Sequence, residues 1–143
     1  MKIASGDSHT CGITPDARIV CWGDGTDPKA KQDINYGQSA PPDGTFKEVS
    51  AGGVHTCAIA TDDTLVCWGA GNAADPNGDR PFLGQANPPK GTFRSVTCGE
   101  AHSCAIDTRT DAVVCWGGSG ANLDCFPPGS YVCGQTEPPP RGR

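Results

Sequence analysis

The sequence predicts an all-β protein made of three copies of one short unit. An eight-residue pattern ending in His-(Thr/Ser)-Cys occurs at residues 4–11, 50–57 and 97–104, and each copy is followed by Val-Cys-Trp-Gly. Gly and Pro fall at matching positions in the copies and interrupt every apolar pattern of helical period. Self-similarity at this interval is typical of repeat proteins.

The repeat boundaries follow from this phasing. We divide the chain into residues 1–48, 49–95 and 96–143. Units of this size bury their apolar faces against the next unit, so three units have two internal interfaces and two ends. Repeat folds of this kind more often provide binding surfaces than reaction sites, and we expect the same here.

The second repeat shows the expected strands most clearly. We expect a strand over Thr45–Ala51, a second over His55–Ala60 and a third over Leu65–Gly69. Thr61–Thr64 has turn composition, so residues 55–69 are predicted to form a β-hairpin.

Alternation along the hairpin assigns its two faces. The residues expected on one face are His55, Cys57, Ile59, Leu65 and Cys67. Val66 and Trp68 are expected on the opposite face, and Cys57 and Cys67 lie across from each other.

A polar loop follows each hairpin, at residues 24–36, 70–83 and 118–133. Each loop leads into Gly-Gln and then Pro-Pro. Since proline cannot donate to a strand ladder, we expect the last strand of each unit to be short and to lie on an edge.

Cysteine is the main indication of the cellular compartment. Eight of the nine cysteines form local couples, which are Cys11 with Cys21, Cys57 with Cys67, Cys104 with Cys115, and Cys125 with Cys133. We predict disulfides in these couples, each stabilising the fold by about 3 kcal/mol; metal binding and free thiols are the alternatives. Disulfides place the protein outside the cytoplasm, in an extracellular or periplasmic location.

Cys98 has no local partner. An unpaired cysteine in an exported chain suggests an intermolecular bond or a free thiol. The alternative is a buried small residue, because Cys98 aligns with Ser5 and Ala51 in the other repeats.

Charge and hydropathy exclude two classes of partner. The net charge is −5 and no run of Lys or Arg occurs, which argues against nucleic-acid binding. No apolar stretch is long enough for a membrane span. Met1 and Lys2 run directly into the first repeat, so we expect export to be signalled elsewhere, or the chain to be a mature segment or an expressed fragment.

The shared pattern resembles the regulator of chromosome condensation (RCC1) repeat. The residues that carry it are Ala-Gly-x-x-His-Thr-Cys-Ala-Ile, Val-Cys-Trp-Gly, Gly-Gln and Pro-Pro-x-Gly-Thr-Phe, in the cysteine-bearing form of secreted bacterial proteins. The resemblance implies a β-propeller with four-stranded blades around a channel. It also implies a protein-binding platform, because members include a nucleotide-exchange factor for a small GTPase and a secreted β-lactamase inhibitor.

Two departures from this family limit what is carried over. Family propellers have about seven blades, whereas this chain supplies three. The basic features of the chromatin-associated members are absent from this acidic chain. We therefore expect neither nucleotide exchange nor chromatin binding.

Three blades leave two blade faces uncovered. Ile3 aligns with Val49 and Val96. The first residues of one chain, laid against the last residues of another, would therefore nearly rebuild a complete junction between repeats. We expect head-to-tail self-assembly into a ring or a filament. A fragment of a larger seven-bladed propeller is the alternative.

Residues found in every repeat are expected to serve the blade itself. His9, His55 and His102 are expected to make structural hydrogen bonds, with a metal cluster as the alternative. Tryptophans are expected to pack between blades with their indole N–H groups satisfied; they are Trp22, Trp68 and Trp116. We predict no catalytic residue, no metal and no cofactor, so the chain is not expected to be an enzyme.

Recognition is expected where the repeats differ, in the loops. The candidate contact residues are Tyr36, Arg80, Phe82, Phe126 and Tyr131. The Cys125–Cys133 couple would rigidify the third loop. The leading hypothesis is an extracellular binding or structural module that self-assembles and presents these loops to another protein; a secreted enzyme inhibitor is the alternative.

Overall fold

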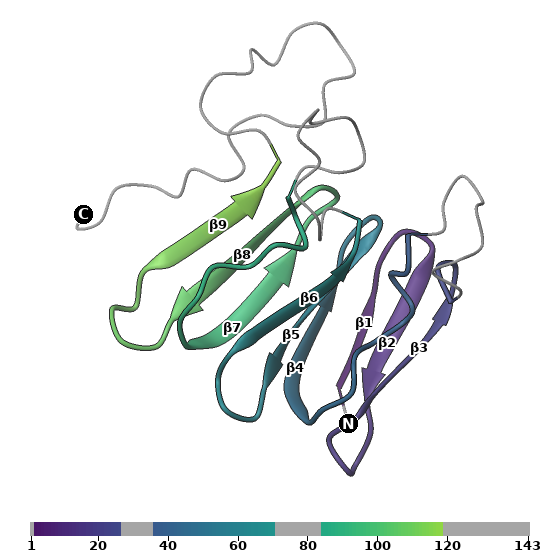
Figure 1. Cartoon of the computed structure of the whole chain (residues 1–143), viewed down its shortest axis with the longest axis horizontal. Coiled ribbons are helices and arrows are strands. Elements are labelled where there is room, and N and C mark those ends of the chain that lie inside the picture. The colour runs from purple at the N-terminus through teal and green to yellow at the C-terminus, as the bar shows by residue number, and fades with distance from the viewer. Residues whose placement is uncertain (1, 27–35, 71–83, 119–143) are drawn as a thin grey trace, which may run out of the picture.

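The computed structural model describes residues 2–26, 36–70 and 84–118, which form three antiparallel sheets of three strands each (Figure 1). The described residues contain no helix, and hence none that could cross a membrane. The first sheet contains β1 (Lys2–Ser5), β2 (His9–Ile13) and β3 (Ile19–Gly23). The second contains β4 (Phe46–Ala51), β5 (His55–Ala60) and β6 (Leu65–Gly69), and the third β7 (Phe93–Cys98), β8 (His102–Asp107) and β9 (Val113–Gly117).

The predicted hairpin over residues 55–69 is confirmed. β5 pairs with β6 in a register that sets Cys57 opposite Cys67 and Ile59 opposite Leu65. The first and third sheets have the same register around their own cysteine pairs. Period-2 alternation therefore places corresponding side chains on corresponding faces in all three sheets.

The sheets stack face to face, so that β4 packs on β1 and β2, and β7 packs on β4 and β5 (Figure 1). We call the contact between the first and second sheets the first junction, and that between the second and third sheets the second junction. Both junctions are apolar. The buried residues of the first are Cys11, Ile13, Ile19, Phe46, Ala58 and Trp68. Those of the second are Cys57, Ile59, Phe93, Val96 and Ala105.

The hairpin turn of each of the first two sheets is hydrogen-bonded to the first strand of the next sheet. The backbone N–H of Phe46 donates to the carbonyl of Ala17 at 2.7 Å, and that of Phe93 donates to the carbonyl of Asp63 at 2.8 Å. Ala17 and Asp63 have φ of 65° and 73°. These bonds start β4 and β7 at the same height on the preceding sheet, which gives both junctions the same alignment.

The disulfides predicted in the three hairpins are confirmed. Bonds join Cys11 to Cys21, Cys57 to Cys67, and Cys104 to Cys115. Their Cα atoms are 4.1, 4.1 and 4.0 Å apart, since the paired strands approach closely there. The first two bonds lie on faces that point to the next sheet, and the third lies on the open face of the third sheet. The predicted Cys125–Cys133 couple lies outside the described residues.

The fourth strand expected in each unit is not seen in the described part of the chain. Residues 36–45 and 84–92, which contain the Gly-Gln and Pro-Pro pairs, form turns and bends. A four-stranded sheet therefore stays a prediction. Strands β4 and β7 begin at Phe46 and Phe93, so the repeat boundaries that we set after residues 48 and 95 fall within these two strands. The three-repeat division stays a proposal, with one sheet as the centre of each repeat.

Candidate functional site: the junctions and the open faces

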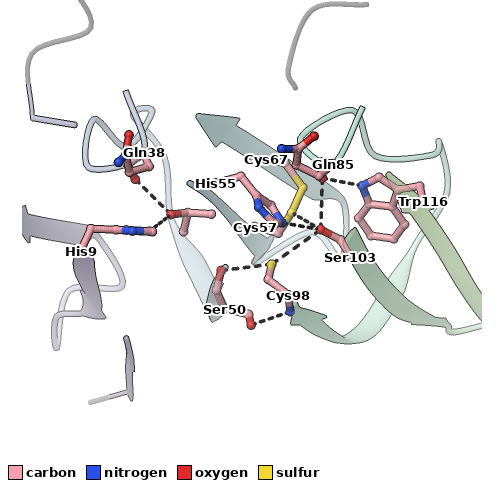
Figure 2. Close-up of a disulfide and its surroundings, with 11 residues drawn as sticks. His9, Gln38, Ser50, His55, Cys57, Cys67, Gln85, Cys98, Ser103 and Trp116 are labelled. Atoms are coloured by element: carbon pink, nitrogen blue, oxygen red, sulfur yellow. Dashed lines mark hydrogen bonds between the residues drawn. A yellow bond between two sulfur atoms is a disulfide. The ribbon is translucent and has the colours of Figure 1, made fainter. Parts of the chain in front are cut away.

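A hydrogen-bonded group at the second junction links the two sheets (Figure 2). The Ser103 hydroxyl donates to the backbone carbonyl of Gln85 at 3.1 Å, and the indole N–H of Trp116 donates to the same carbonyl at 2.9 Å. His55 Nε2 lies 2.8 Å from the Ser103 oxygen. Because the hydroxyl proton is directed at Gln85, Nε2 carries the proton and donates to Ser103.

The first junction contains the same arrangement, which we call the histidine clamp at both places. His9 Nε2 lies 2.7 Å from the Thr56 hydroxyl oxygen, and that hydroxyl donates to the carbonyl of Gln38 at 3.0 Å. Trp68 Nε1 donates to the carbonyl of Gln38 at 2.8 Å. Each clamp thus joins a histidine of one sheet to a hydroxyl and a tryptophan of the next.

Burial keeps the clamp histidines neutral. It lowers the pKa of His55 to about 4, and repulsion from His9 and His102 adds to this effect. Burial also lowers the pKa values of His9 and His102. The neutral form has one proton per ring, and the clamp uses that proton at Nε2, in agreement with the structural role expected for these histidines.

Metal-ligating side chains come together at one place in the described residues. The ligand atoms of His55, Cys57 and Cys98 lie within 4.8 Å of one another. Cys57 is bonded to Cys67, so its sulfur is not a thiolate and this group is not a set of three metal ligands in the oxidised protein.

The two outer faces of the stack are open. On the third sheet, an apolar hollow of about 210 Å³ is lined by Cys104, Ile106 and Val113, together with parts of β7. On the first sheet, Ile3 is 67% exposed and Trp22 is 50% exposed, whereas the corresponding Trp68 in the first junction is 6% exposed. The open faces therefore carry the residue types that fill the junctions.

Comparison with known proteins identifies the repeat. Residues 2–27 and 46–73 match the regulator of chromosome condensation (RCC1) repeat. These two stretches contain the first two sheets, which are therefore RCC1-like repeats. The three sheets are thus three blades of an RCC1-like β-propeller, as the sequence pattern predicts.

Solved structures support this fold. The ectodomain of the Arabidopsis thaliana receptor kinase ACR4 superposes with a TM-score of 0.55 and 28% identity, over 81% of this chain and 35% of that one. The ectodomain of the Physcomitrella patens receptor kinase CR4 gives 0.56 and 26%, over 82% and 29%. Saccharomyces cerevisiae Prp20 gives 0.58 and 20%, over 81% and 32%.

The chain spans about a third of the length of these solved structures. Among curated proteins, no significant match was found. The comparisons therefore establish the RCC1-like fold.

The loop residues predicted to contact a partner lie almost entirely outside the described residues. This applies to Arg80, Phe82, Phe126 and Tyr131. Tyr36 is half-buried, and its backbone N–H donates to Gln38 Oε1 at 2.9 Å. A contact role for these five residues stays a prediction.

Cys98 lies inside the second junction of the RCC1 blades and is partly buried there. Its thiol donates to the carbonyl of Ser50 at 3.4 Å, and its backbone N–H donates to the Ser50 hydroxyl at 2.9 Å. This is the location expected for a small residue between blades. The predicted intermolecular bond stays a prediction.

The hydroxyl member of the clamp was not anticipated from the sequence. A hydroxyl residue follows the histidine in each of the three sequence repeats, at Thr10, Thr56 and Ser103. That recurrence was the available signal. The other partner, the carbonyl of Gln38 or Gln85, belongs to the backbone and has no side-chain signature beyond the Gly-Gln pair.

Proposed function

We propose that this chain is a non-catalytic extracellular binding module. In this proposal a second copy completes the blade stack head to tail, and the loops after β3, β6 and β9 present contact residues to a protein partner. The observation that carries the proposal is that the two open faces correspond to the two halves of a filled junction.

The apolar residues of the open faces are complementary. Ile106 and Val113 on the third blade correspond to Ile59 and Leu65, which pack against Phe93 and Val96 in the second junction. Ile3 on the first blade takes the position of Val96 and is 67% exposed. Docking the first blade of one copy on the third blade of another would bury Ile3 in the hollow beside Val113.

The polar residues of the open faces are complementary as well. His102 is the clamp histidine of the third blade, and Thr10 and Trp22 hold the hydroxyl and indole positions on the first blade. A head-to-tail contact would let His102 donate to Thr10, as His55 does to Ser103. Two copies would supply six blades, within the usual range of about four to eight for propellers.

The location and the partner class rest on further observations. Three disulfides support an oxidising compartment, and hence an extracellular or periplasmic protein. Among similar structures, yeast RCC1 (Prp20) was solved bound to Kap60, and Prp20p has binding properties toward Gsp1p and histones. These examples favour a protein partner for an RCC1-like surface.

Native mass spectrometry of the unreduced protein tests the assembly. We expect a discrete dimer or trimer, or a ladder of larger species for an open filament. The variant Ile3→Lys should be monomeric, because it would bury a charge in the contact. Asp43→Asn makes the same change in net charge at an exposed residue in the segment that leads from β3 to β4, and this variant should assemble normally. A monomeric wild-type protein at all concentrations would overturn the proposal.

A further inference from the structure

The second junction contains a free thiol beside a disulfide. Cys98 on β7 faces the second sheet, and its sulfur lies within 4.8 Å of Cys57 Sγ, which is bonded to Cys67 (Figure 2). The two sulfurs belong to different blades. This places a nucleophile and a disulfide in one small buried space.

The backbone and neighbouring hydroxyl groups hold the Cys98 side chain in this place. The thiol donates to the Ser50 carbonyl at 3.4 Å, and the Ser103 hydroxyl lies 3.7 Å from the sulfur. The Ser103 oxygen is also 3.6 Å from Cys57 Sγ, so one hydroxyl contacts both sulfurs. Cys98 therefore has little freedom to turn away from the disulfide.

The first junction shows that packing does not require sulfur at this position. There Ala51 is paired with Thr56 as Cys98 is paired with Ser103, so alanine takes the place of the cysteine. The clamp is complete with alanine present, since His9, Thr56 and Gln38 make the same hydrogen bonds. The thiol of Cys98 is thus an addition to a junction that is complete without it.

We propose that Cys98 exchanges with the Cys57–Cys67 disulfide and converts a bond within one blade into a bond between two blades. The Cys98 thiol loses its proton to solvent base, and the thiolate attacks Cys57 Sγ. The Cys57–Cys67 bond breaks as the Cys57–Cys98 bond forms. Cys67 leaves as a thiolate and takes up a proton. One disulfide and one thiol are present before and after, so no oxidant or reductant is consumed.

The exchange changes what the disulfide connects. The Cys57–Cys67 bond joins neighbouring strands of one hairpin, β5 and β6, whereas a Cys57–Cys98 bond would join β5 to β7 across the second junction. The second and third blades, which the chain already connects, would then also be cross-linked at their contact. We infer a latent lock between these two blades.

The surroundings of the thiol set the condition for exchange. Burial raises the pKa of the Cys98 thiol, although hydrogen bonds from Ser103 and Ser50 act in the opposite direction. The thiol is therefore protonated at neutral pH and the hairpin bond persists. Only the thiolate attacks, so the exchange rate should rise about tenfold per pH unit below the thiol pKa.

Disulfide mapping of the folded wild-type protein tests this proposal. The protein is incubated at pH 7 and pH 9 without reductant, quenched in acid, alkylated, digested without reduction and analysed by mass spectrometry. We expect the label on Cys98 at pH 7, and a growing fraction at pH 9 with label on Cys67 and a Cys57–Cys98 link. A label confined to Cys98 at both pH values would overturn the proposal. So would a Cys98 bond to Cys125, to Cys133 or to a second chain.

Three variants make the test specific to the geometry. Cys98→Ala should keep only the Cys57–Cys67 link at every pH. Ala51→Cys places a thiol beside the Cys11–Cys21 bond, and the introduced thiol should become linked to Cys11. Cys67→Ser leaves Cys57 and Cys98 as thiols, which should join under mild oxidant; if both stay free in the folded protein, the proposal is wrong. Should that variant fail to fold, the wild-type mapping decides.

Discussion

The first and second junctions share one polar frame but differ in the small residue beside the disulfide. In both, a buried histidine donates to a hydroxyl that donates to a backbone carbonyl of a Gly-Gln pair. Ala51 has in the first sheet pair the register position that Cys98 has in the next, and Cys98 lies next to the Cys57–Cys67 disulfide. The clamp is therefore the part that stacking of the blades requires. The position beside the disulfide is free to acquire a different chemistry.

Substitution of a closely packed glycine should give the largest loss of stability at either junction. A Cβ on Gly6 would collide with the carbonyl of Gly52 and lie 2.8 Å from His9 Cε1. A Cβ on Gly52 would collide with the carbonyl of Gly99 and lie 2.7 Å from His55 Nδ1. Backbone carbonyls cannot move aside, so Gly6→Ala and Gly52→Ala should each lower the free energy of unfolding by about 3 kcal/mol or more.

Urea unfolding followed by near-ultraviolet circular dichroism measures this loss. Gly12→Ala is the matched control, because its Cβ would come only within 3.4 Å of the Lys2 carbonyl. It should cost much less than the other two substitutions. Equal losses for all three variants would show that contact between the sheets is not what distinguishes Gly6 and Gly52 from Gly12.

The junctions should respond differently to acid. His55 has its pKa lowered to about 4, so between pH 6.5 and pH 4 the unfolded chain binds a proton that the folded chain does not. Stability is therefore complete above pH 6.5 and declines by about 3 kcal/mol as the pH falls to 4. For His9, burial lowers the pKa, but Asp7 and Asp24 raise it in part, so its contribution should be smaller.

Urea titrations at pH 7, 5.5 and 4 distinguish the two histidines. His55→Gln should remove most of the decline between pH 6.5 and pH 4, and His9→Gln should remove less. Both variants lose a clamp bond and should be less stable than the wild type at pH 7. If the two variants flatten the pH profile equally, the two junctions do not differ electrostatically.

The hairpins and their disulfides could be predicted from sequence because they are local. Alternation alone sets Cys57 opposite Cys67 and puts Trp68 on the other face, and the structure confirms both. The proximity of Cys98 to this bond could not be predicted in the same way. It depends on which face of the second sheet receives the third, and that is settled by backbone bonds such as Phe93 to Asp63.

The candidate site was only partly predictable for a related reason. A structural hydrogen bond was expected for the histidines, but its partners were not identified. The acceptor at the end of each clamp is the carbonyl of Gln38 or Gln85, and a backbone group leaves no mark on residue identity. The fourth strand was expected from the propeller resemblance, yet residues 36–45 and 84–92 form the turns and bends that contain these carbonyls.

The smallest of the three effects concerns the clamp hydroxyl. Ser103→Ala would leave the His55 Nε2–H group buried without its acceptor, while Trp116 still donates to the Gln85 carbonyl. We expect a loss of about 2 kcal/mol in the free energy of unfolding, the usual cost of one unsatisfied buried donor. Thr56→Ala should cost a similar amount at the first junction, plus a contribution from the lost methyl group.

Exchange of the two hydroxyl residues sharpens this last comparison. Ser103→Thr should be close to neutral, because threonine makes the same bonds at residue 56. Stability is again measured by urea unfolding at pH 7, where the histidines are neutral. If Ser103→Thr is as costly as Ser103→Ala, then the second junction has no room for the methyl group. Its smaller hydroxyl residue would then be required by the presence of Cys98, whose sulfur lies 3.7 Å from the Ser103 oxygen.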